Sequence, residues 1–258
     1  MAPTTSPAPD YALEAKGLTK RFGAFAAVNN VNLAVQRGSI HALIGPNGAG
    51  KTTCFNLLTK TLQPTEGRIV FDGKDISNMR TADVARLGLV RSFQISATFP
   101  NLTALENVRV ALQSGRASQW QFWRPISALA PLDVRAMELL EKVGLANAAH
   151  LTSAELSYGK KRALEIATTL ALDPKVMLLD EPTAGMGHED IEPITALIRE
   201  AAVGRTVLIV EHNLSVVSNL CDRITVLTHG EVLTEGTYAE VSSNPEVITA
   251  YMGGVDDE

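Results

Sequence analysis

Residues 45–52, with the sequence GPNGAGKT, constrain the fold of this chain more than any other segment. They match the phosphate-binding pattern G-x-x-x-x-G-K-[ST], in which a strand leads into a glycine-rich loop and a helix follows it. An apolar run at residues 40–44 precedes the loop, and a helix-forming segment at residues 53–58 follows it. The backbone N–H groups of such a loop and the N-terminus of its helix face the same anion. The sequence therefore predicts a site for the phosphates of a nucleoside triphosphate.

The side chains of this loop have separate expected roles. Lys51 would contact the β- and γ-phosphates as a point charge, and the Thr52 hydroxyl would ligate Mg²⁺. The glycines allow the backbone to approach the phosphates because no Cβ atom stands in the way. The nucleotide-binding residues expected in this segment are Gly45, Pro46, Asn47, Gly48, Ala49, Gly50, Lys51, Thr52 and Thr53.

Length and composition restrict the possible classes of protein. The chain has 258 residues, of which 45% are hydrophobic, and this suits one α/β domain or two small ones. Its net charge of −5 argues against a broad nucleic-acid-binding surface. No run approaches about 18 consecutive apolar residues, so any membrane role is expected to depend on a partner. Residues 1–10 are rich in Ala, Pro and Thr, and we expect a disordered tail rather than a signal peptide.

Two kinds of sequence alternate along the chain. Short β-type runs dominate residues 11–76, whereas apolar residues at helical spacing dominate residues 81–162. The alternation of strands and helices then returns, with largely apolar runs at 176–179 and 206–210 on either side of a helix-like segment at 191–202. Such runs are typical of strands buried on both faces of a parallel sheet. The pattern predicts one α/β core that is interrupted by a helical subdomain.

Polar residues follow the two apolar runs at the points where the expected strands end. Asp180 and Glu181 follow the first run, and His212 follows the second after Glu211. The carboxyl ends of parallel strands border the crevice where open α/β sheets bind ligands. Asp180 is therefore expected to hold Mg²⁺, and Glu181 to orient or polarise the attacking water. His212 is expected on the same edge, within reach of the γ-phosphate.

The segment Leu156-Ser157-Tyr158-Gly159-Lys160 distinguishes between classes of nucleotide-binding protein. It resembles the LSGGQ signature of the ATP-binding cassette (ABC) ATPases, and the resemblance extends from about residue 13 to the end of the chain. In that family, two subunits hold two ATP molecules head to tail, and each signature completes the site of the other subunit. The resemblance implies that Ser157 and Gly159 bind the nucleotide of a second subunit. Ser157 is also expected to cap the helix that follows it, whose N-terminal dipole favours an anion.

The other positions of the family pattern also have counterparts in this chain. Phe22 resembles the aromatic residue that stacks on adenine, and Gln94 resembles the glutamine that contacts Mg²⁺ and water. The resemblance assigns Asp180 as the Mg²⁺ ligand, Glu181 as the catalytic carboxylate and His212 as the switch histidine. The resemblance therefore implies ATP and Mg²⁺ as cofactors. It implies that Glu181, His212 and Gln94 act in catalysis. The implied Mg²⁺ ligands are Thr52, Gln94 and Asp180.

The resemblance also implies a fold and a division of the chain. We expect a P-loop NTPase of the ABC type, with a RecA-like α/β core, an antiparallel β subdomain and an inserted helical subdomain. A single ABC ATPase domain would span 11–258. The ATP-binding core would comprise 11–95 and 163–240, the helical subdomain 96–162, and a C-terminal helix and tail 241–258.

Departures from the common pattern indicate a subfamily. Tyr158 replaces the second residue of the usual glycine pair, which resembles the ATPases of branched-chain (hydrophobic) amino-acid importers, and the chain is similar to the longer of their two types. The implied partners are transmembrane permease subunits, a second ABC ATPase subunit of the same or another kind, and indirectly an extracytoplasmic solute-binding protein, with no nucleic acid. The implied location is peripheral, at the cytoplasmic face of the cell membrane. Gly187 stands where the family has Asp or Asn, so the sequence does not decide how the two ATP sites communicate.

Three alternatives remain at this stage. An importer for urea or short amides has a closely similar ATPase, and selectivity for the solute is not encoded in this subunit. A soluble ABC ATPase of translation or DNA repair is disfavoured because the chain has neither a second cassette nor a long coiled coil. The insert around Trp120 and Trp123 is expected to pack or to contact a protein, and stacking on nucleic acid is the weaker alternative.

Overall fold

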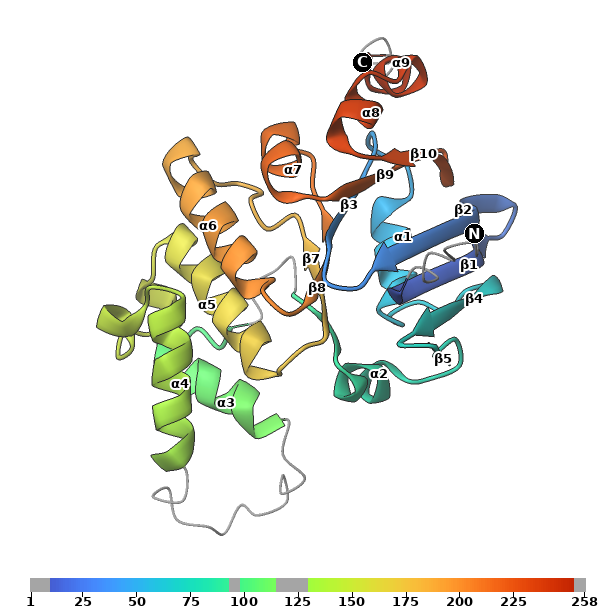
Figure 1. Cartoon of the computed structure of the whole chain (residues 1–258). Coiled ribbons are helices and arrows are strands. Elements are labelled where there is room, and N and C mark those ends of the chain that lie inside the picture. The colour runs from blue at the N-terminus through green and yellow to red at the C-terminus, as the bar shows by residue number, and fades with distance from the viewer. Residues whose placement is uncertain (1–9, 93–97, 115–129, 253–258) are drawn as a thin grey trace, which may run out of the picture.

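An antiparallel sheet forms the first part of the structure. The computed structural model describes residues 10–92, 98–114 and 130–252 of the chain (Figure 1). Its first sheet has the strand order β2-β1-β4-β5, and every neighbouring pair is antiparallel. The strands are β1 (Tyr11–Phe22), β2 (Phe25–Gln36), β4 (Glu66–Phe71) and β5 (Lys74–Asp75). This sheet confirms the expected antiparallel β subdomain.

The second sheet carries the predicted parallel strands. Its order is β10-β9-β3-β8-β7-β6, and all neighbours are parallel except the hairpin of β9 and β10. The strands are β3 (Ile40–Ile44), β6 (Leu89–Arg91), β7 (Val176–Asp180), β8 (Thr206–Val210), β9 (Arg223–Thr228) and β10 (Glu231–Gly236). Every residue of β3, β7 and β8 is buried, and for β7 and β8 the apolar runs at 176–179 and 206–210 predicted this.

Helices surround this parallel sheet. They are α1 (Lys51–Leu58), α2 (Thr81–Leu87), α3 (Ala104–Ser114), α4 (Ala130–Lys142), α5 (Tyr158–Ala171), α6 (His188–Ala201), α7 (Leu214–Leu220), α8 (Tyr238–Ser242) and α9 (Pro245–Met252). Two short 3₁₀ helices, Ala146–Ala148 and Ser153–Glu155, connect α4 to α5. Helices α3 to α6 gather on one side of the parallel sheet, whereas α1 and the antiparallel sheet lie on the other side (Figure 1). The sequence did not predict helix α7 or strand β6.

The parallel strands separate two apolar cores. Side chains alternate across a strand, so neighbouring residues enter opposite cores. Ala42 and Ile44 of β3 belong to the core beneath α3 to α6, while Leu43 belongs to the core that contains Phe55 of α1. Burying one such aliphatic side chain contributes about 1.5–3 kcal/mol. The strand before the phosphate loop is thus fixed from both faces, which gives the loop a rigid base.

A histidine lies inside this rigid strand. His41 of β3 is fully buried, and its Nε2 lies 2.8 Å from Thr225 Oγ1 of β9. Burial lowers the pKa of His41 to about 4, while the charges of Glu235 and Arg223 act in opposite directions. The folded chain therefore holds the imidazole in its neutral form.

We predict that His41 makes folding sensitive to acid. The pKa of His41 is lower in the folded chain than in the unfolded chain, so the unfolded chain binds a proton first as the pH falls. The stability that neutral His41 contributes is therefore complete above its ordinary pKa and is lost as the pH falls towards the pKa of the folded state. Between about pH 7 and about pH 5, the wild type should lose about 2 kcal/mol of unfolding free energy that the His41→Leu variant retains. Urea denaturation at both pH values measures this difference, and parallel pH profiles of the two proteins would refute it. The substitution does not leave the Thr225 hydroxyl without a partner, because this hydroxyl also donates a hydrogen bond to Glu235.

Candidate nucleotide-binding and catalytic site

The phosphate loop joins β3 to α1 in the predicted manner. Gly45 and Gly50 have φ values of 151° and 93°, and a Cβ atom at either would lie within 2.4 Å of a backbone carbonyl oxygen, Leu227 O or Ala27 O. Helix α1 begins at Lys51 with no side-chain cap and no acidic residue in its first turn. The first N–H groups of a helix have no partner within the helix, so an uncapped end is a ready site for an anion. The loop therefore fits the phosphates of a nucleotide.

Lys51 lies folded against its own loop. Its Nζ donates hydrogen bonds to Gly45 O at 2.6 Å and to Pro46 O at 2.9 Å. Half-burial lowers the pKa of Lys51, and the nearby charge of Glu181 opposes that effect. The structure thus brings Lys51 and Glu181 together, although they are 130 positions apart in the sequence. Phosphate oxygens are stronger acceptors than the two carbonyls, so the ammonium is well placed to bind them.

The two acids after β7 occupy different surroundings. Asp180 is 3% exposed, and Arg91 of β6 forms a salt bridge with it through Nη2. The other terminal nitrogen of Arg91 donates to Asn56 Oδ1 at 2.6 Å, which ties the pair to α1. Glu181 is more accessible and has a φ of 45°, and its N–H donates to Val210 O of β8 at 2.9 Å. Few non-glycine residues adopt a positive φ, and such residues cluster at functional sites.

The chemistry of these residues fits Mg²⁺ bound together with phosphates. Among residues 10–92, 98–114 and 130–252, no group of three His, Cys, Asp or Glu side chains could by itself hold a metal ion. Mg²⁺ usually takes one or two carboxylates together with substrate phosphates and water rather than a cage made by protein alone. Asp180, on the strand beside β8, and the exposed Thr52, at the start of α1, supply one carboxylate and one hydroxyl.

Glu211 is a residue of the site that the sequence reasoning did not assign. Its side chain is fully buried, and Oε1 accepts hydrogen bonds from the N–H and the hydroxyl of Thr183. Its Oε2 accepts from the N–H groups of His212 at 2.8 Å and Asn213 at 3.0 Å. Glu211 therefore joins the turn after β7, which carries Glu181, to the turn after β8, which carries His212. An acid directly after a buried strand is the only sequence signal for this role.

His212 itself faces outward from that turn. Its side chain is 62% exposed, and Nδ1 lies 3.9 Å from Glu211 Oε2. The strand register pairs Asp180 with Val210, so His212 follows β8 at the edge where Asp180 ends β7. The parallel pairing confirms the expected placement of Asp180, Glu181 and His212 along one sheet edge. Their catalytic roles remain predictions.

The signature segment lies at the start of α5. Ser157 occupies the N-cap position and is exposed, but its side chain makes no capping hydrogen bond, which corrects the expectation that it caps the helix. Gly159 packs against Asp190 of α6, where a Cβ atom would lie 2.9 Å from Oδ1. Ser157 and Gly159 line a cleft shared with α6 and residues 143–145, and this cleft includes none of the phosphate-loop residues 45–52. The Ser157 hydroxyl and the end of α5 remain accessible to another molecule.

Phe22 and Gln94 complete the predicted set. Phe22 ends β1 with 50% of its surface exposed, and the Lys20 ammonium lies 5.2 Å from the ring centroid. An exposed aromatic face of this kind can stack on a planar ring. Gln94 lies outside the described residues, as do Trp120, Trp123 and the tail at residues 1–9.

A phosphate loop after a buried parallel strand, next to acidic strand ends, defines the P-loop class of nucleotide-binding proteins. Residues 28–184 match the family described as ABC transporter, and residues 231–257 match the family described as branched-chain amino acid ATP-binding cassette transporter. The chain belongs to the ABC transporter family. It is therefore an ATPase whose reaction is coupled to transport, as the signature segment predicted.

Three similar proteins define this relationship further. The high-affinity branched-chain amino acid transport ATP-binding protein BraF of Pseudomonas aeruginosa is 40% identical over 93% of this chain and 97% of its own length. The ADP conformation of an ABC transporter cassette superposes with a TM-score of 0.83 at 31% identity, covering 94% of this chain and 99% of that one. A cassette described as a dimer in a post-hydrolysis state, bound to ADP and Pi, gives a TM-score of 0.75 at 28% identity, with coverage of 88% and 98%.

The part of the chain that the structure describes includes no helix with the length and apolarity needed to cross a membrane.

Proposed function

We propose that this chain is the ATP-hydrolysing subunit of an importer for branched-chain amino acids, bound at the cytoplasmic face of the membrane through its permease subunits. The observation that carries the proposal is an intact phosphate loop, Asp180, Glu181 and His212 in a chain that is 40% identical to BraF along nearly its whole length. An extracytoplasmic solute-binding protein would deliver the amino acid to the permeases.

Each of the predicted site residues has a proposed role in ATP hydrolysis. The loop N–H groups and Lys51 bind the β- and γ-phosphates, and Phe22 stacks on the adenine. Thr52, Asp180 and Gln94 would hold Mg²⁺, which would neutralise charge on the transferred phosphoryl group. Glu181 accepts a hydrogen bond from the attacking water and positions it in line with the γ-phosphorus. His212 donates to the γ-phosphate from the neighbouring strand end.

A second subunit completes each site. Ser157 has a free hydroxyl at the uncapped start of α5, and this helix has no acidic residue in its first turn. A helix end of this kind favours an anion, and here the γ-phosphate on the phosphate loop of a partner would supply it. The dimeric cassette bound to ADP and Pi supports such an assembly. ATP binding would close the dimer, and hydrolysis with phosphate release would reopen it.

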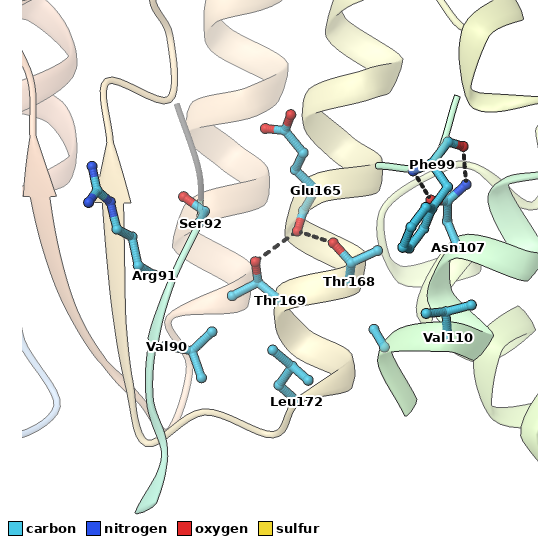
Figure 2. Close-up of a pocket in the computed structure, with 11 residues that line it drawn as sticks. Val90, Arg91, Ser92, Phe99, Asn107, Val110, Glu165, Thr168, Thr169 and Leu172 are labelled. Atoms are coloured by element: carbon cyan, nitrogen blue, oxygen red, sulfur yellow. Dashed lines mark hydrogen bonds between the residues drawn. The ribbon is translucent and has the colours of Figure 1, made fainter. Parts of the chain in front are cut away.

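A groove between β6, α3 and α5 is the proposed docking site of the permease. Val90 of β6, Val110 of α3 and Leu172 at the end of α5 provide its apolar walls (Figure 2). Asn107 shapes the rim because its side chain both accepts from Phe99 N at 2.7 Å and donates to Phe99 O at 3.1 Å. An apolar groove of this kind suits an amphipathic helix from a partner.

The same strand links this groove to the expected metal ligand. Val90, Arg91 and Ser92 all line the groove, and Arg91 also forms the salt bridge with Asp180. A partner that displaces β6 from within the groove would therefore also displace Arg91 from Asp180. Movement of the permease and the charge around Asp180 would be coupled in this way.

Glu181→Gln should separate ATP binding from transport. The variant keeps the shape of the side chain but loses the carboxylate, so we expect unchanged ATP affinity, a fall in kcat of about a hundredfold or more, and loss of ATP-driven leucine uptake by vesicles with the assembled transporter. Glu192→Gln on the exposed face of α6 is the matched control and should behave as the wild type. Wild-type turnover by Glu181→Gln would remove Glu181 from catalysis. Uptake of urea but not of leucine by the wild type would contradict the proposed solute.

Val110→Glu should uncouple the subunit from its permease. A carboxylate buried in an apolar interface lacks a partner, so we expect about a tenfold or greater loss of permease binding and a matching loss of leucine uptake. Pull-down of the permease subunits and equilibrium ATP binding measure the two properties, and ATP binding should not change. Val134→Glu, at a 65% exposed position of α4, is the control. Normal permease binding by Val110→Glu would rule out this groove as the docking site.

A further inference from the structure

The tyrosine in the signature connects two parts of the same chain. Its hydroxyl donates a hydrogen bond to the Ala184 carbonyl oxygen at 2.7 Å, and Ala184 follows the acids at the end of β7. The hydroxyl also accepts from Arg162 Nη2 at 2.9 Å, and the Arg162 guanidinium carbon lies 5.3 Å from the ring centroid. Both the donor and an acceptor capacity of the phenol are therefore in use.

Ala184 leads directly to the expected catalytic carboxylate. Its N–H donates to the Glu181 carbonyl oxygen at 3.0 Å, which closes the turn that gives Glu181 its positive φ. The preceding residue, Thr183, is buried and bonded to Glu211, which also holds the N–H of His212. This turn is thus fixed from α5 by the phenol of Tyr158 and from β8 by the carboxylate of Glu211.

The other end of the connection reaches the proposed docking groove. Arg162 is 7% exposed, and its Nη1 forms a salt bridge of 2.8 Å with Glu165 one turn along α5. Glu165 lines the groove in Figure 2, and its carbonyl accepts from the hydroxyls of Thr168 and Thr169. Polar contacts therefore run without a break from the groove to the turn that carries Glu181.

We propose that the Tyr158 hydroxyl is a positioning group that couples the signature of this chain to its own catalytic turn. The proposal rests on the head-to-tail dimer of the proposed function, in which one chain gives its phosphate loop to one ATP and its signature to the other. A shift of α5 at one site then moves Ala184, and with it Glu181, at the other site. Gly187 has no side chain to carry such a signal across the interface, whereas Tyr158 acts within the chain on Ala184, three residues before Gly187.

Tyr158→Phe tests this coupling because it removes only the hydroxyl. The ring remains over Arg162, while the hydrogen bond to Ala184 is lost. For the purified assembled transporter, we expect kcat for ATP to fall about tenfold, with KM within about twofold, because the change displaces Glu181 but no group that holds the nucleotide on the same chain. Tyr238→Phe, at an exposed position of α8, is the matched control and should leave both constants unchanged.

A second variant breaks the same connection from its other side. Thr183→Val removes the hydroxyl that bonds to Glu211 and should also lower kcat with little effect on KM, so the proposal can be judged even if Tyr158→Phe does not fold. The double variant should lose less than the product of the two single losses, since both disturb one turn. Wild-type kcat in both single variants, or losses that multiply independently, would overturn the proposal. Absence of ATP hydrolysis by the wild type would instead contradict the proposed function itself.

Discussion

The parallel pairing of β3, β8 and β7 is the constraint on which the rest of the structure depends. It places the ends of three fully buried strands along one edge, so the phosphate loop, the acids at 180–181 and the turn at 211–213 meet although they are distant in sequence. Apolar cores on both faces hold these strands, and the turns between them can then carry positive φ values and close backbone contacts. The buried strands stabilise the fold, while the strained backbone is confined to the turns at their ends.

Most of the fold and part of the site could be predicted from the sequence. Continuous apolar runs identified β3, β7 and β8, and the glycine pattern identified the loop and α1. Strand β6 has three residues, which is too short for any periodicity, so the salt bridge of Arg91 with Asp180 was not foreseen. The role of Glu211 depends on tertiary hydrogen bonds to Thr183. Ser157 has the expected position but not the expected cap, because a capping hydrogen bond depends on a side-chain rotamer that residue type does not fix.

In the proposed dimer, the ATP site needs residues from both chains. The phosphate loop presents the start of α1 to the phosphates, but the accessible start of α5 lies in a separate cleft bounded by α6. We propose that these two uncapped helix ends, which both favour an anion, act on one γ-phosphate from different subunits. In this proposed arrangement, closure of the dimer would depend on ATP. It also explains why contacts within a chain, such as that of Tyr158 with Ala184, are able to relate the two sites to each other.

The most direct test of this account mixes two inactive variants. Lys51→Ala disables the phosphate loop of a chain and leaves its signature intact, while Ser157→Arg blocks the signature and leaves the loop intact. Each variant alone should show almost no ATP hydrolysis. A one-to-one mixture should regain up to about a quarter of the wild-type rate, because random pairing gives half mixed dimers, each with one of its two sites intact. A mixture no more active than the separate variants would contradict the claim that two copies of this chain build each ATP site.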